Sequence, residues 1–386
     1  MNCRADRSVA VEPRSDWDGH GGVLEIDLEA IAANWRLLAA QVAPAACAAV
    51  VKADAYGLGA APVARALAEA GCRTFFVALP HEGAEVREAV GDGPAIAVLG
   101  GYFPDAEALY ARRRLGPVLS TPGQISAWQA AAWRDAAGSV PAYVHVDTGI
   151  NRLGLAMAEW NALCAGDGLA RLGLAGVISH LACADEPAHP LNARQLAAFR
   201  AVLQGLPEPL PGSLANSSGI FLGSTFHFGL VRPGAALFGI NPTPGRPNPM
   251  HPVVRLRGRI LQVRQIDRGE AVGYGATFVA PTQRKLATVA VGYADGLHRA
   301  SSNRGRVFCQ SFPAPIVGRV SMDMITIDLT DVPKNTAQPG DFVDIIGPSH
   351  DVDAAAAEAG TIGYEVLTAL GRRYRRRYLG TDTAAR

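Results

Sequence analysis

The sequence predicts an α/β chain in which an N-terminal (β/α)8 barrel precedes a mostly β C-terminal domain. Eight short apolar runs lie between residues 47 and 240, and stretches with helical spacing of apolar residues separate most of them. Alternating strands and helices of this kind form parallel sheets, and eight units close most simply into a barrel. Beyond Ile240 the long helical patterns stop, and segments rich in β-branched residues follow.

The barrel is expected to begin after a short apolar run, Val23–Ile26, and a helix over Leu28–Val42. Its eight predicted strands are Cys47–Val51, Thr74–Leu79, Ala95–Leu99, Pro117–Leu119, Ala142–Val146, Ala175–Ser179, Ser213–Ala215 and Gly229–Val231. The predicted helices are Ala61–Ala70, Glu82–Val90, Asp105–Arg113, Gln124–Trp133 and Asn192–Leu206. In such a barrel the chemistry lies at the carboxyl ends of the strands.

A proline-rich segment marks the predicted boundary between the domains. Asn241–Pro252 contains five prolines in twelve residues, which is typical of a linker. We therefore expect a flexible N-terminal extension over residues 1–20, the barrel over 21–245 and the β domain over 246–386. The strands of that domain are expected in VVRLRGRILQVRQI, KLATVAVGYADG, RVFCQ, APIVGRVSMDMITIDL and DFVDIIG, and one helix over Ala354–Arg372. The arginines of RRYRRR, which begins at Arg372, suggest either an acidic partner or a solvated chain end, and the near-neutral overall charge favours the solvated chain end.

Composition and charge exclude several functional classes. Of the 386 residues, 49% are hydrophobic and 18% charged, with a net charge of +1, so no overall field attracts nucleic acid or an anionic membrane. No apolar run reaches the ~18–20 residues of a membrane span. The first 20 residues hold four acidic groups and lack the apolar core of a secretory signal. Six scattered cysteines without metal-ligand spacing indicate reduced thiols, no metal site and a cytoplasmic protein.

One lysine stands directly after a predicted barrel strand. In CAAVVKADAYGLGA the apolar run leads into Lys52, after which the chain turns. Burial at the mouth of a barrel lowers the pKa of an ammonium group and frees a nucleophilic amine, as Schiff-base chemistry requires. A lysine at a strand end also reaches solvent easily, so the residues alone leave a catalytic and a solvated Lys52 equally open.

The segment VVKADAYGLGA closely resembles the one that carries the pyridoxal-phosphate lysine in the alanine racemases. Six further segments resemble that family in the same order, from about Val23 to Tyr378: HVDTGINRLG, SHLACAD, ANSSG, VRPGAALFGINP, VGYADG and VGRVSMD. The resemblance implies the fold predicted above, pyridoxal 5'-phosphate as cofactor, and a head-to-tail homodimer with shared active sites. It also implies interconversion of L-alanine and D-alanine by two bases, which would supply D-alanine for cell-wall peptidoglycan.

The resemblance implies two residues as the catalytic bases. Lys52 would bind the cofactor covalently and act as the base for D-alanine, and Tyr293 of VGYADG would act on L-alanine across the dimer interface. On its own, a tyrosine after an apolar run is more ordinarily a strand-end residue. The usual pKa of a tyrosine, about 10, is too high for a good base at neutral pH, so neighbouring positive charge must assist it.

The resemblance also assigns residues that hold the cofactor. Arg232 of VRPG takes the place beside the pyridine nitrogen, where a pKa above about 12 keeps that nitrogen largely unprotonated. His180 is expected to hold Arg232, although a lone histidine at a strand end is equally a satisfied core residue. The phosphate would be bound by the Ser217 hydroxyl, the backbone N–H groups of Gly234 and Ala235, and Tyr56.

Substrate binding is implied for two further groups. Arg152 of DTGINRLG would contact the substrate carboxylate and the phenolic oxygen of the cofactor, since a guanidinium fork can address two acceptors. The backbone N–H of Met322 in SMD would complete the carboxylate site, although Met322 alone resembles a core residue of the β domain. Asp323 and Arg319 are expected at the entrance.

One position departs from the family. Many alanine racemases carry a carbamylated lysine seven residues before the arginine that corresponds to Arg152, and its negative charge orients that arginine. Here the position is His145, and an imidazole supplies no negative charge. We expect a neutral His145 that accepts a hydrogen bond through one ring nitrogen, with Arg152 either held by another acceptor or less rigidly placed.

Three alternatives share parts of this pattern. The first is another racemase of the same fold that acts on serine, lysine or several amino acids. It would differ only in its side-chain pocket, where one methylene changes the free energy of discrimination by only ~1–3 kcal/mol. A related decarboxylase also pairs a barrel with a β domain, but its glycine triplet and acid–cysteine pair are missing from this sequence. A pyridoxal-phosphate homeostasis protein binds the cofactor without racemase activity. It consists of one barrel and lacks the domain that carries Tyr293 and Met322.

Overall fold

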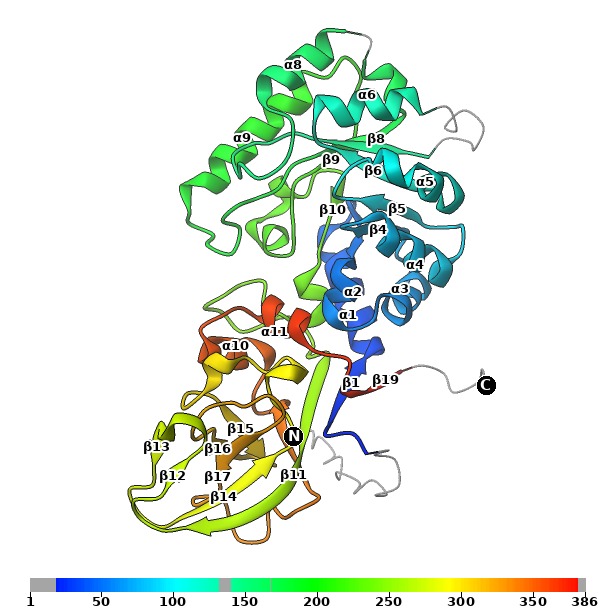
Figure 1. Ribbon diagram of the computed structural model, residues 1–386. Helices are drawn as coiled ribbons and strands as arrows, with labels where there is room; N and C mark the ends of the chain where they lie inside the picture. The colour runs from blue at the N-terminus through cyan, green and yellow to red at the C-terminus, as the bar shows by residue number, and fades with distance from the viewer. Residues whose placement is uncertain (1–18, 132–139, 167, 381–386) are drawn as a thin grey trace, which may run out of the picture.

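The computed structural model describes residues 19–131, 140–166 and 168–380. Figure 1 shows two lobes joined near the middle of the molecule, one with strands surrounded by helices and the other built mainly of strands. Most of the extension expected over residues 1–20 lies outside the described residues, as does the end of the helix expected over Gln124–Trp133.

Eight parallel strands close the barrel in the predicted order. Seven are hydrogen-bonded side by side: β3 (Ala49–Val50), β4 (Thr74–Val77), β5 (Ala95–Val98), β6 (Leu115–Leu119), β7 (Ala142–His145), β8 (Leu174–Ile178) and β9 (Gly212–Ser213). The eighth, β10 (Leu230–Val231), pairs with β2 (Ala46–Cys47), which continues into β3. Hydrogen bonds from Arg232 N to Ala215 O (2.9 Å) and from Ala48 N to Val231 O (3.0 Å) close the ring.

Both faces of the barrel strands are apolar. One buried cluster fills the interior and consists of Ala48, Val50, Phe76, Ala97, Val118, Tyr143, Ile178 and Leu230. Neighbours along the same strands, such as Phe75 and Val77, belong to a second cluster that packs beneath the helices. Successive side chains of a strand point to opposite faces, so burial on both faces explains why these strands form continuous apolar runs in the sequence.

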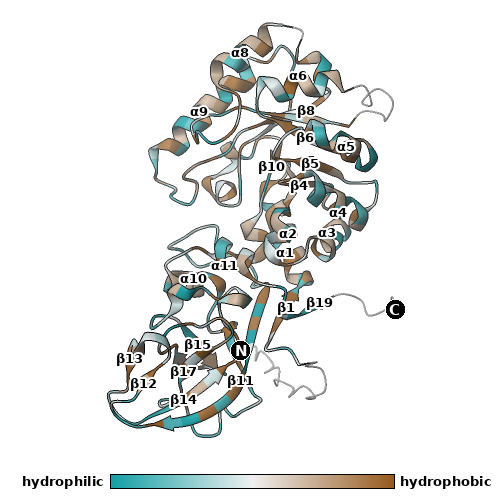
Figure 2. Ribbon diagram, in the orientation of Figure 1, coloured by the Kyte–Doolittle hydropathy of each residue, from teal (hydrophilic) through white to brown (hydrophobic). Residues whose placement is uncertain are grey.

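Helices surround the barrel, and local residues set where they begin. They are α1 (Leu28–Val42), α3 (Ala60–Glu69), α4 (Pro80–Val90), α5 (Glu107–Arg113), α6 (Pro122–Ala130), α8 (Met157–Ala165) and α9 (Pro190–Gln204). The Asp27 side chain caps α1 by accepting a hydrogen bond from Ala30 N (2.9 Å), and a proline opens α4, α6 and α9. Figure 2 shows hydrophilic residues on these helices, clearly on α5 and α9. None of the helices in the described ranges is both long and apolar enough to cross a membrane.

The second domain is built on an eight-stranded sheet. Its main path runs through β16 (Phe312–Pro315), β15 (Arg306–Cys309), β18 (Phe342–Ile346), β11 (Val254–Ile266), β1 (Gly22–Asp27) and β19 (Arg375–Leu379). β14 (Arg284–Val289) pairs with β11 and with β17 (Ile325–Asp328), and β12 (Ala271–Val272) forms a separate pair with β13 (Phe278–Val279). Figure 2 shows polar and apolar residues alternating along β11, as a strand with one buried face requires. The barrel and this sheet confirm the predicted fold class.

The two ends of the described chain meet in this sheet. β1 pairs antiparallel with β11 and parallel with β19, so the apolar run Val23–Ile26 belongs to the second sheet. Three arginines of the arginine-rich segment, Arg375–Arg377, lie half-buried in the edge strand β19, whereas Arg372 and Arg373 are exposed, so only part of the segment is the solvated chain end that was expected. Glu25 is buried in β1 and pairs with Arg257 (2.7 Å) and Arg377 (3.7 Å), because a buried carboxylate needs an opposite charge.

A glycine divides the helix that was expected over Ala354–Arg372. The structure has α10 (Val352–Ala359) and α11 (Gly363–Ala369) in its place. Gly360 ends α10 with a φ of +70°, a left-handed conformation that glycine adopts without steric cost. α11 packs against the barrel so closely that a Cβ on Gly57 would lie 2.4 Å from Leu367 O. The second domain thereby closes one side of the barrel mouth.

Candidate active site

A cavity of about 830 Å³ opens at the carboxyl ends of the barrel strands, and α11 forms one of its walls. The predicted site residues of the barrel all line it: Lys52, Tyr56, Arg152, His180, Ser217, Arg232, Gly234 and Ala235. They come from the segments after the first, fifth, sixth, seventh and eighth strands, which are far apart in the sequence. Tyr293 and Met322 do not line this cavity.

Lys52 stands at the start of an unusual backbone turn. The four residues after it, Ala53, Asp54, Ala55 and Tyr56, have φ values of 53°, 54°, 51° and 57° and form one turn of left-handed helix within α2 (Lys52–Gly57). Left-handed backbone costs a non-glycine residue roughly 1–2 kcal/mol, so surrounding contacts must hold the turn. Backbone strain of this kind concentrates at functional sites.

The surroundings of Lys52 favour its neutral amine. Burial lowers the pKa of Lys52 from its ordinary value, and the positive charge of Arg152 lowers it further. Glu82 opposes this shift, and one of its carboxylate oxygens accepts a hydrogen bond from Ala53 N (2.7 Å). A lowered pKa increases the fraction of Lys52 that is nucleophilic and able to accept a proton at neutral pH.

Arg232 is a buried cation held by neutral acceptors. Its guanidinium donates hydrogen bonds to Ser213 O (2.8 Å), Ser213 Oγ (2.5 Å) and Ser179 O (2.6 Å). Burial lowers the pKa of Arg232 to about 10, so the group stays charged at neutral pH. His180 was expected to hold Arg232, but the hydrogen bonds of Arg232 go to Ser213 and Ser179 instead. Burial and the Arg232 charge instead lower the pKa of His180 well below its usual value, which keeps the ring neutral.

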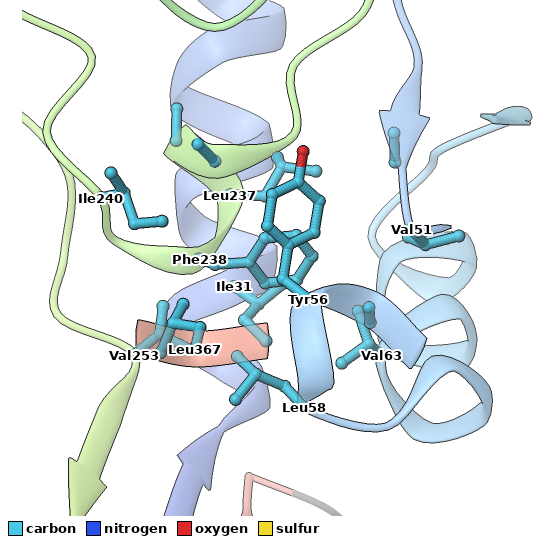
Figure 3. Packing of buried hydrophobic residues seen from close by; sticks show 14 of the residues in the cluster. Ile31, Val51, Tyr56, Leu58, Val63, Leu237, Phe238, Ile240, Val253 and Leu367 are labelled. Carbon is cyan, nitrogen blue, oxygen red and sulfur yellow. The ribbon is translucent and has the colours of Figure 1, made fainter. Parts of the chain in front are cut away.

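Ser217, Gly234 and Tyr56 meet at another side of the cavity. Ser217 Oγ accepts hydrogen bonds from Gly234 N (3.0 Å) and Ala236 N (3.2 Å). A Cβ on Gly234 would lie 2.3 Å from Tyr56 Oη, so only glycine permits this approach. The Tyr56 ring packs against Phe238 with its hydroxyl pointing away from the apolar side chains beneath it (Figure 3). Burial raises the pKa of Tyr56, so its phenol keeps its proton and can donate it in a hydrogen bond.

Sequence reasoning missed the contribution of α11 to this cavity. Tyr364 and Glu365 line the cavity from the second domain, and the Tyr364 ring centroid lies 6.0 Å from that of Tyr56. Both residues belong to a short helix with no motif that separates them from ordinary surface residues. Only the tertiary contact of α11 with α2 brings a second phenol to this side of the cavity.

Arg152 enters the cavity from the loop after β7. Asp147 shapes this loop by accepting hydrogen bonds from Gly149 N (2.8 Å) and Ile150 N (3.0 Å). Within the ranges that the structure describes, the Arg152 guanidinium has no hydrogen bond or ion pair, so its fork is available to an anionic ligand.

His145 lies at the end of β7 and lines the same cavity. Burial lowers the pKa of His145 to about 4, and the charge of Arg232 adds to this effect. The ring is therefore neutral at pH 7. Its Nε2 is buried and has no hydrogen-bond partner among the described residues, so the hydrogen bond expected through one ring nitrogen is not found at this atom.

Tyr293 and Met322 lie together in the second domain. Tyr293 N donates to Ser321 O (3.0 Å) and Ala294 N to Met322 O (2.9 Å), while the two residues are 43% and 54% exposed. Gly292 permits this contact, because a Cβ there would lie 2.3 Å from Met322 O. The structure thus joins the loops that carry the two residues and leaves both residues outside the cavity of their own chain.

Asp323 and Arg319, which were expected at the entrance, belong to the same domain and also lie outside the cavity lining. Asp323 Oδ1 accepts a hydrogen bond from Arg373 Nη1 (2.7 Å), and Arg373 Nε lies 3.1 Å from Asp295 Oδ1. Asp295 Oδ2 in turn accepts from Gly292 N (2.9 Å). One arginine therefore ties the VGYADG loop to the SMD loop.

Comparison with known proteins gives two family matches that together span most of the chain. The alanine racemase N-terminal domain matches residues 26–242, and the alanine racemase C-terminal domain matches residues 253–378. A catabolic alanine racemase from Mesorhizobium japonicum is 50% identical over 382 residues, covering 98% of this chain and 99% of that protein. An alanine racemase from Rhodospirillum rubrum is 51% identical over 360 residues, covering 93% and 96%.

Solved structures agree with these matches. The crystal structure of alanine racemase from Bartonella henselae with covalently bound pyridoxal phosphate has a TM-score of 0.88 at 42% identity, covering 93% of this chain and 99% of that one. The biosynthetic alanine racemase from Pseudomonas aeruginosa has a TM-score of 0.85 at 34% identity, with the same coverage. Two domain matches and relatives similar over nearly their whole length show that the chain belongs to the alanine racemase family.

Proposed function

We propose that this chain is a pyridoxal-phosphate-dependent alanine racemase that interconverts L-alanine and D-alanine. The observation that carries the proposal is the composition of the cavity, which gathers an amine of lowered pKa, a buried arginine held by neutral acceptors and an arginine free to bind an anion: Lys52, Arg232 and Arg152. Relatives that share about half of the sequence are named alanine racemases, which supports alanine as the substrate.

The cavity residues fit pyridoxal 5'-phosphate. Lys52 would bind its aldehyde carbon and Arg232 its ring nitrogen, while Ser217, Tyr56 and the backbone at Gly234 and Ala235 would bind its phosphate. The missing Cβ at Gly234 supports this assignment, because it allows the hydroxyl groups of Ser217 and Tyr56 to lie close to the backbone of Gly234. When bound, the cofactor supplies an electron sink that acidifies the α-hydrogen of an amino acid.

The side chains around the cavity determine where protons are held. Arg232 keeps its own proton at neutral pH, so it would hold the ring nitrogen of the cofactor by a hydrogen bond without protonating it. His145 and His180 stay neutral and add no positive charge beside the two arginines. Arg152 would bind the substrate carboxylate, and Lys52 Nζ would take or return the α-proton on one face of the substrate.

We also propose a head-to-tail homodimer in which Tyr293 and Met322 complete the cavity of the other subunit. Racemisation needs a proton donor and acceptor on each face of the reacting carbon, and Lys52 can serve only one face. Tyr293 and Met322 are exposed, lie outside their own cavity and belong to two loops that backbone hydrogen bonds join, from Tyr293 N to Ser321 O and from Ala294 N to Met322 O. A second copy could therefore receive them as one unit, with Tyr293 Oη as the other base.

The proposed role is the supply of D-alanine for cell-wall peptidoglycan in the cytoplasm, with no nucleic-acid or membrane partner. The near-neutral net charge of +1 supports a small-molecule substrate over a polyanionic partner. Expression in a bacterium that lacks alanine racemase should restore growth without added D-alanine. The Lys52→Ala variant should not restore growth.

Chiral analysis of purified protein tests the substrate assignment. L-alanine, L-serine and L-lysine are incubated separately with protein and pyridoxal phosphate, and the D-enantiomer is quantified over time. Alanine should have the highest kcat/KM. Faster conversion of serine or lysine would replace alanine as the substrate within the same chemistry. Cofactor bound at Lys52 without conversion of any amino acid would instead indicate a cofactor-binding protein.

A further inference from the structure

Glu82 joins the carboxyl ends of two neighbouring barrel strands. Its Oε1 accepts a hydrogen bond from Ala53 N (2.7 Å), directly after Lys52. Its Oε2 accepts from Ala78 N (2.7 Å) and Leu79 N (3.1 Å), directly after β4. One half-buried carboxylate therefore satisfies three backbone donors on the rim of the barrel, and charged acceptors make the stronger hydrogen bonds.

The turn that Glu82 contacts has little intrinsic stability. Four consecutive residues with side chains adopt left-handed backbone there, a conformation that L-residues rarely sustain. Asp54 holds the far end of the turn, because its Oδ1 accepts from Ala60 N (2.7 Å) at the start of α3. Glu82 is thus the side chain that holds the near end, one peptide away from Lys52.

We propose that Glu82 is a positioning residue that fixes the direction of the Lys52 side chain by holding the left-handed turn in place. This inference rests on the proposed role of Lys52 as the residue that binds the cofactor and moves the α-proton. A turn that relaxed toward right-handed backbone would rotate the peptide after Lys52 and move the amine away from the cavity. Glu82 also lies near enough to raise the pKa of the Lys52 amine, so it affects both the direction of the Lys52 side chain and the charge of its amine.

Three variants separate these two effects. Glu82→Gln removes the charge and leaves only one oxygen for three N–H donors, so both effects are lost. Glu82→Asp keeps the charge but is one methylene shorter, so it cannot reach both strand ends. Glu85→Gln is the matched control, because Glu85 lies one turn further along α4, is exposed and makes no hydrogen bond with the described residues.

Amide hydrogen exchange of the full-length chain, followed by mass spectrometry of the peptide over residues 52–59, reports on the turn. Exchange should be at least about tenfold faster in Glu82→Gln and Glu82→Asp than in the unmodified protein, as the loss of a charge-assisted hydrogen bond predicts. It should be unchanged in Glu85→Gln. Acetic anhydride labelling of Lys52 in the full chain freed of cofactor reports on the amine. The pH midpoint of labelling should fall in Glu82→Gln and stay near the original in the other two variants.

Kinetics of the loaded enzyme complete the test. In both Glu82 variants kcat for alanine should fall by about tenfold to a hundredfold, with KM changed far less, because binding of the carboxylate is untouched. The positioning role would be overturned if both Glu82 variants showed the same amide exchange rate and the same labelling midpoint as Glu85→Gln, even in an active racemase. If Glu82→Gln does not fold, exchange in Glu82→Asp decides alone. Failure of borohydride to fix the cofactor on Lys52 of the unmodified protein would instead overturn the proposed function.

Discussion

At Lys52, burial and the neighbouring Arg152 lower the pKa in the same direction, so the amine can both bind a carbonyl carbon and accept a proton. Borohydride treatment of the loaded protein should fix the cofactor on Lys52, as peptide mass mapping would show. Lys52→Ala should lose nearly all activity and regain part of it with added alkylamines, which replace a missing base. A label on Lys285 or Lys334 would contradict the assignment.

His145 connects the site to the pH dependence of folding. Its folded-state pKa of about 4 lies below its ordinary value of 6.5, so between these values the unfolded chain binds more protons. The stability that neutral His145 contributes is therefore present above about pH 6.5 and is lost as the pH falls toward 4. His145→Gln should reduce the slope of unfolding free energy in this window by up to ~1.4 kcal/mol per pH unit.

Urea unfolding at several pH values between 4 and 7.5 measures this slope. His251, which is exposed, provides the control, and His251→Gln should retain the slope of the unmodified protein. Identical slopes in all three proteins would show that His145 carries no depressed pKa.

Sequence motifs that place several polar residues close together in the chain predicted which barrel segments reach the cavity, while the roles of these residues stay predictions. The segments around Lys52, Arg152, Ser217 and Arg232 all supply residues to one cavity. The acceptors of Arg232 were not predicted, because a serine carbonyl at a strand end has no distinguishing sequence signal. Tyr364 was missed for a related reason, since its place at the cavity depends on the packing of a separate domain.

At the scale of elements, the left-handed turn after Lys52 makes an unusual mutational prediction. Ala53 is exposed and has a φ of 53°, so Ala53→Gly removes the steric cost of left-handed backbone. This gain offsets the entropy that glycine adds to the unfolded chain. The unfolding free energy should therefore stay level or rise by up to about 1 kcal/mol.

Ala162 is the matched control, because it is exposed within the right-handed helix α8. Ala162→Gly should lower the unfolding free energy by about 0.5–1 kcal/mol. Thermal and urea unfolding of the two variants measure the difference. Equal destabilisation by both substitutions would contradict the left-handed geometry.

Most helices and strands were predictable, because burial produces a strong pattern of apolar residues in the sequence. Barrel strands buried on both faces form apolar runs, and α1 begins at its capping Asp27. The left-handed turn was not predictable, since ADAY contains no glycine and the turn depends on Glu82 from another unit. The helix break at Gly360 was overlooked, and β19 was hidden because arginines rarely mark a strand. The charge of Arg377 in this strand is paired with Glu25 of the neighbouring strand at 3.7 Å.

At the scale of the whole molecule, the separation of Tyr293 from its own cavity predicts complementation between subunits. Lys52→Ala and Tyr293→Phe proteins should each be nearly inactive with L-alanine. After mixing and subunit exchange, about half of the subunits sit in hybrid dimers, in which one of the two sites carries both intact bases. Activity should then recover to roughly a quarter of the original.

Racemisation assays before and after exchange, with subunit exchange verified by native mass spectrometry, measure this recovery. Two Lys52→Ala preparations mixed in the same way provide the control and should stay inactive. Hybrid dimers without recovered activity would show that each site is built within one chain.

The proline-rich linker predicted two domains, but only the structure places α11 of the second domain against the mouth of the barrel, because such contacts depend on tertiary packing.

The pairing of β1 with β19 also bears on how the chain assembles while it is made. β1 leaves the ribosome before every other described strand, yet its neighbours in the sheet, β11 and β19, follow much later. At ~5–20 residues per second, roughly tens of seconds separate the first strand from the last. All eight barrel strands emerge within that interval, so the barrel can close while β1 still lacks its neighbouring strands. Nascent chains halted before β19 should therefore carry an apolar strand with one open edge, a site for chaperone capture or aggregation.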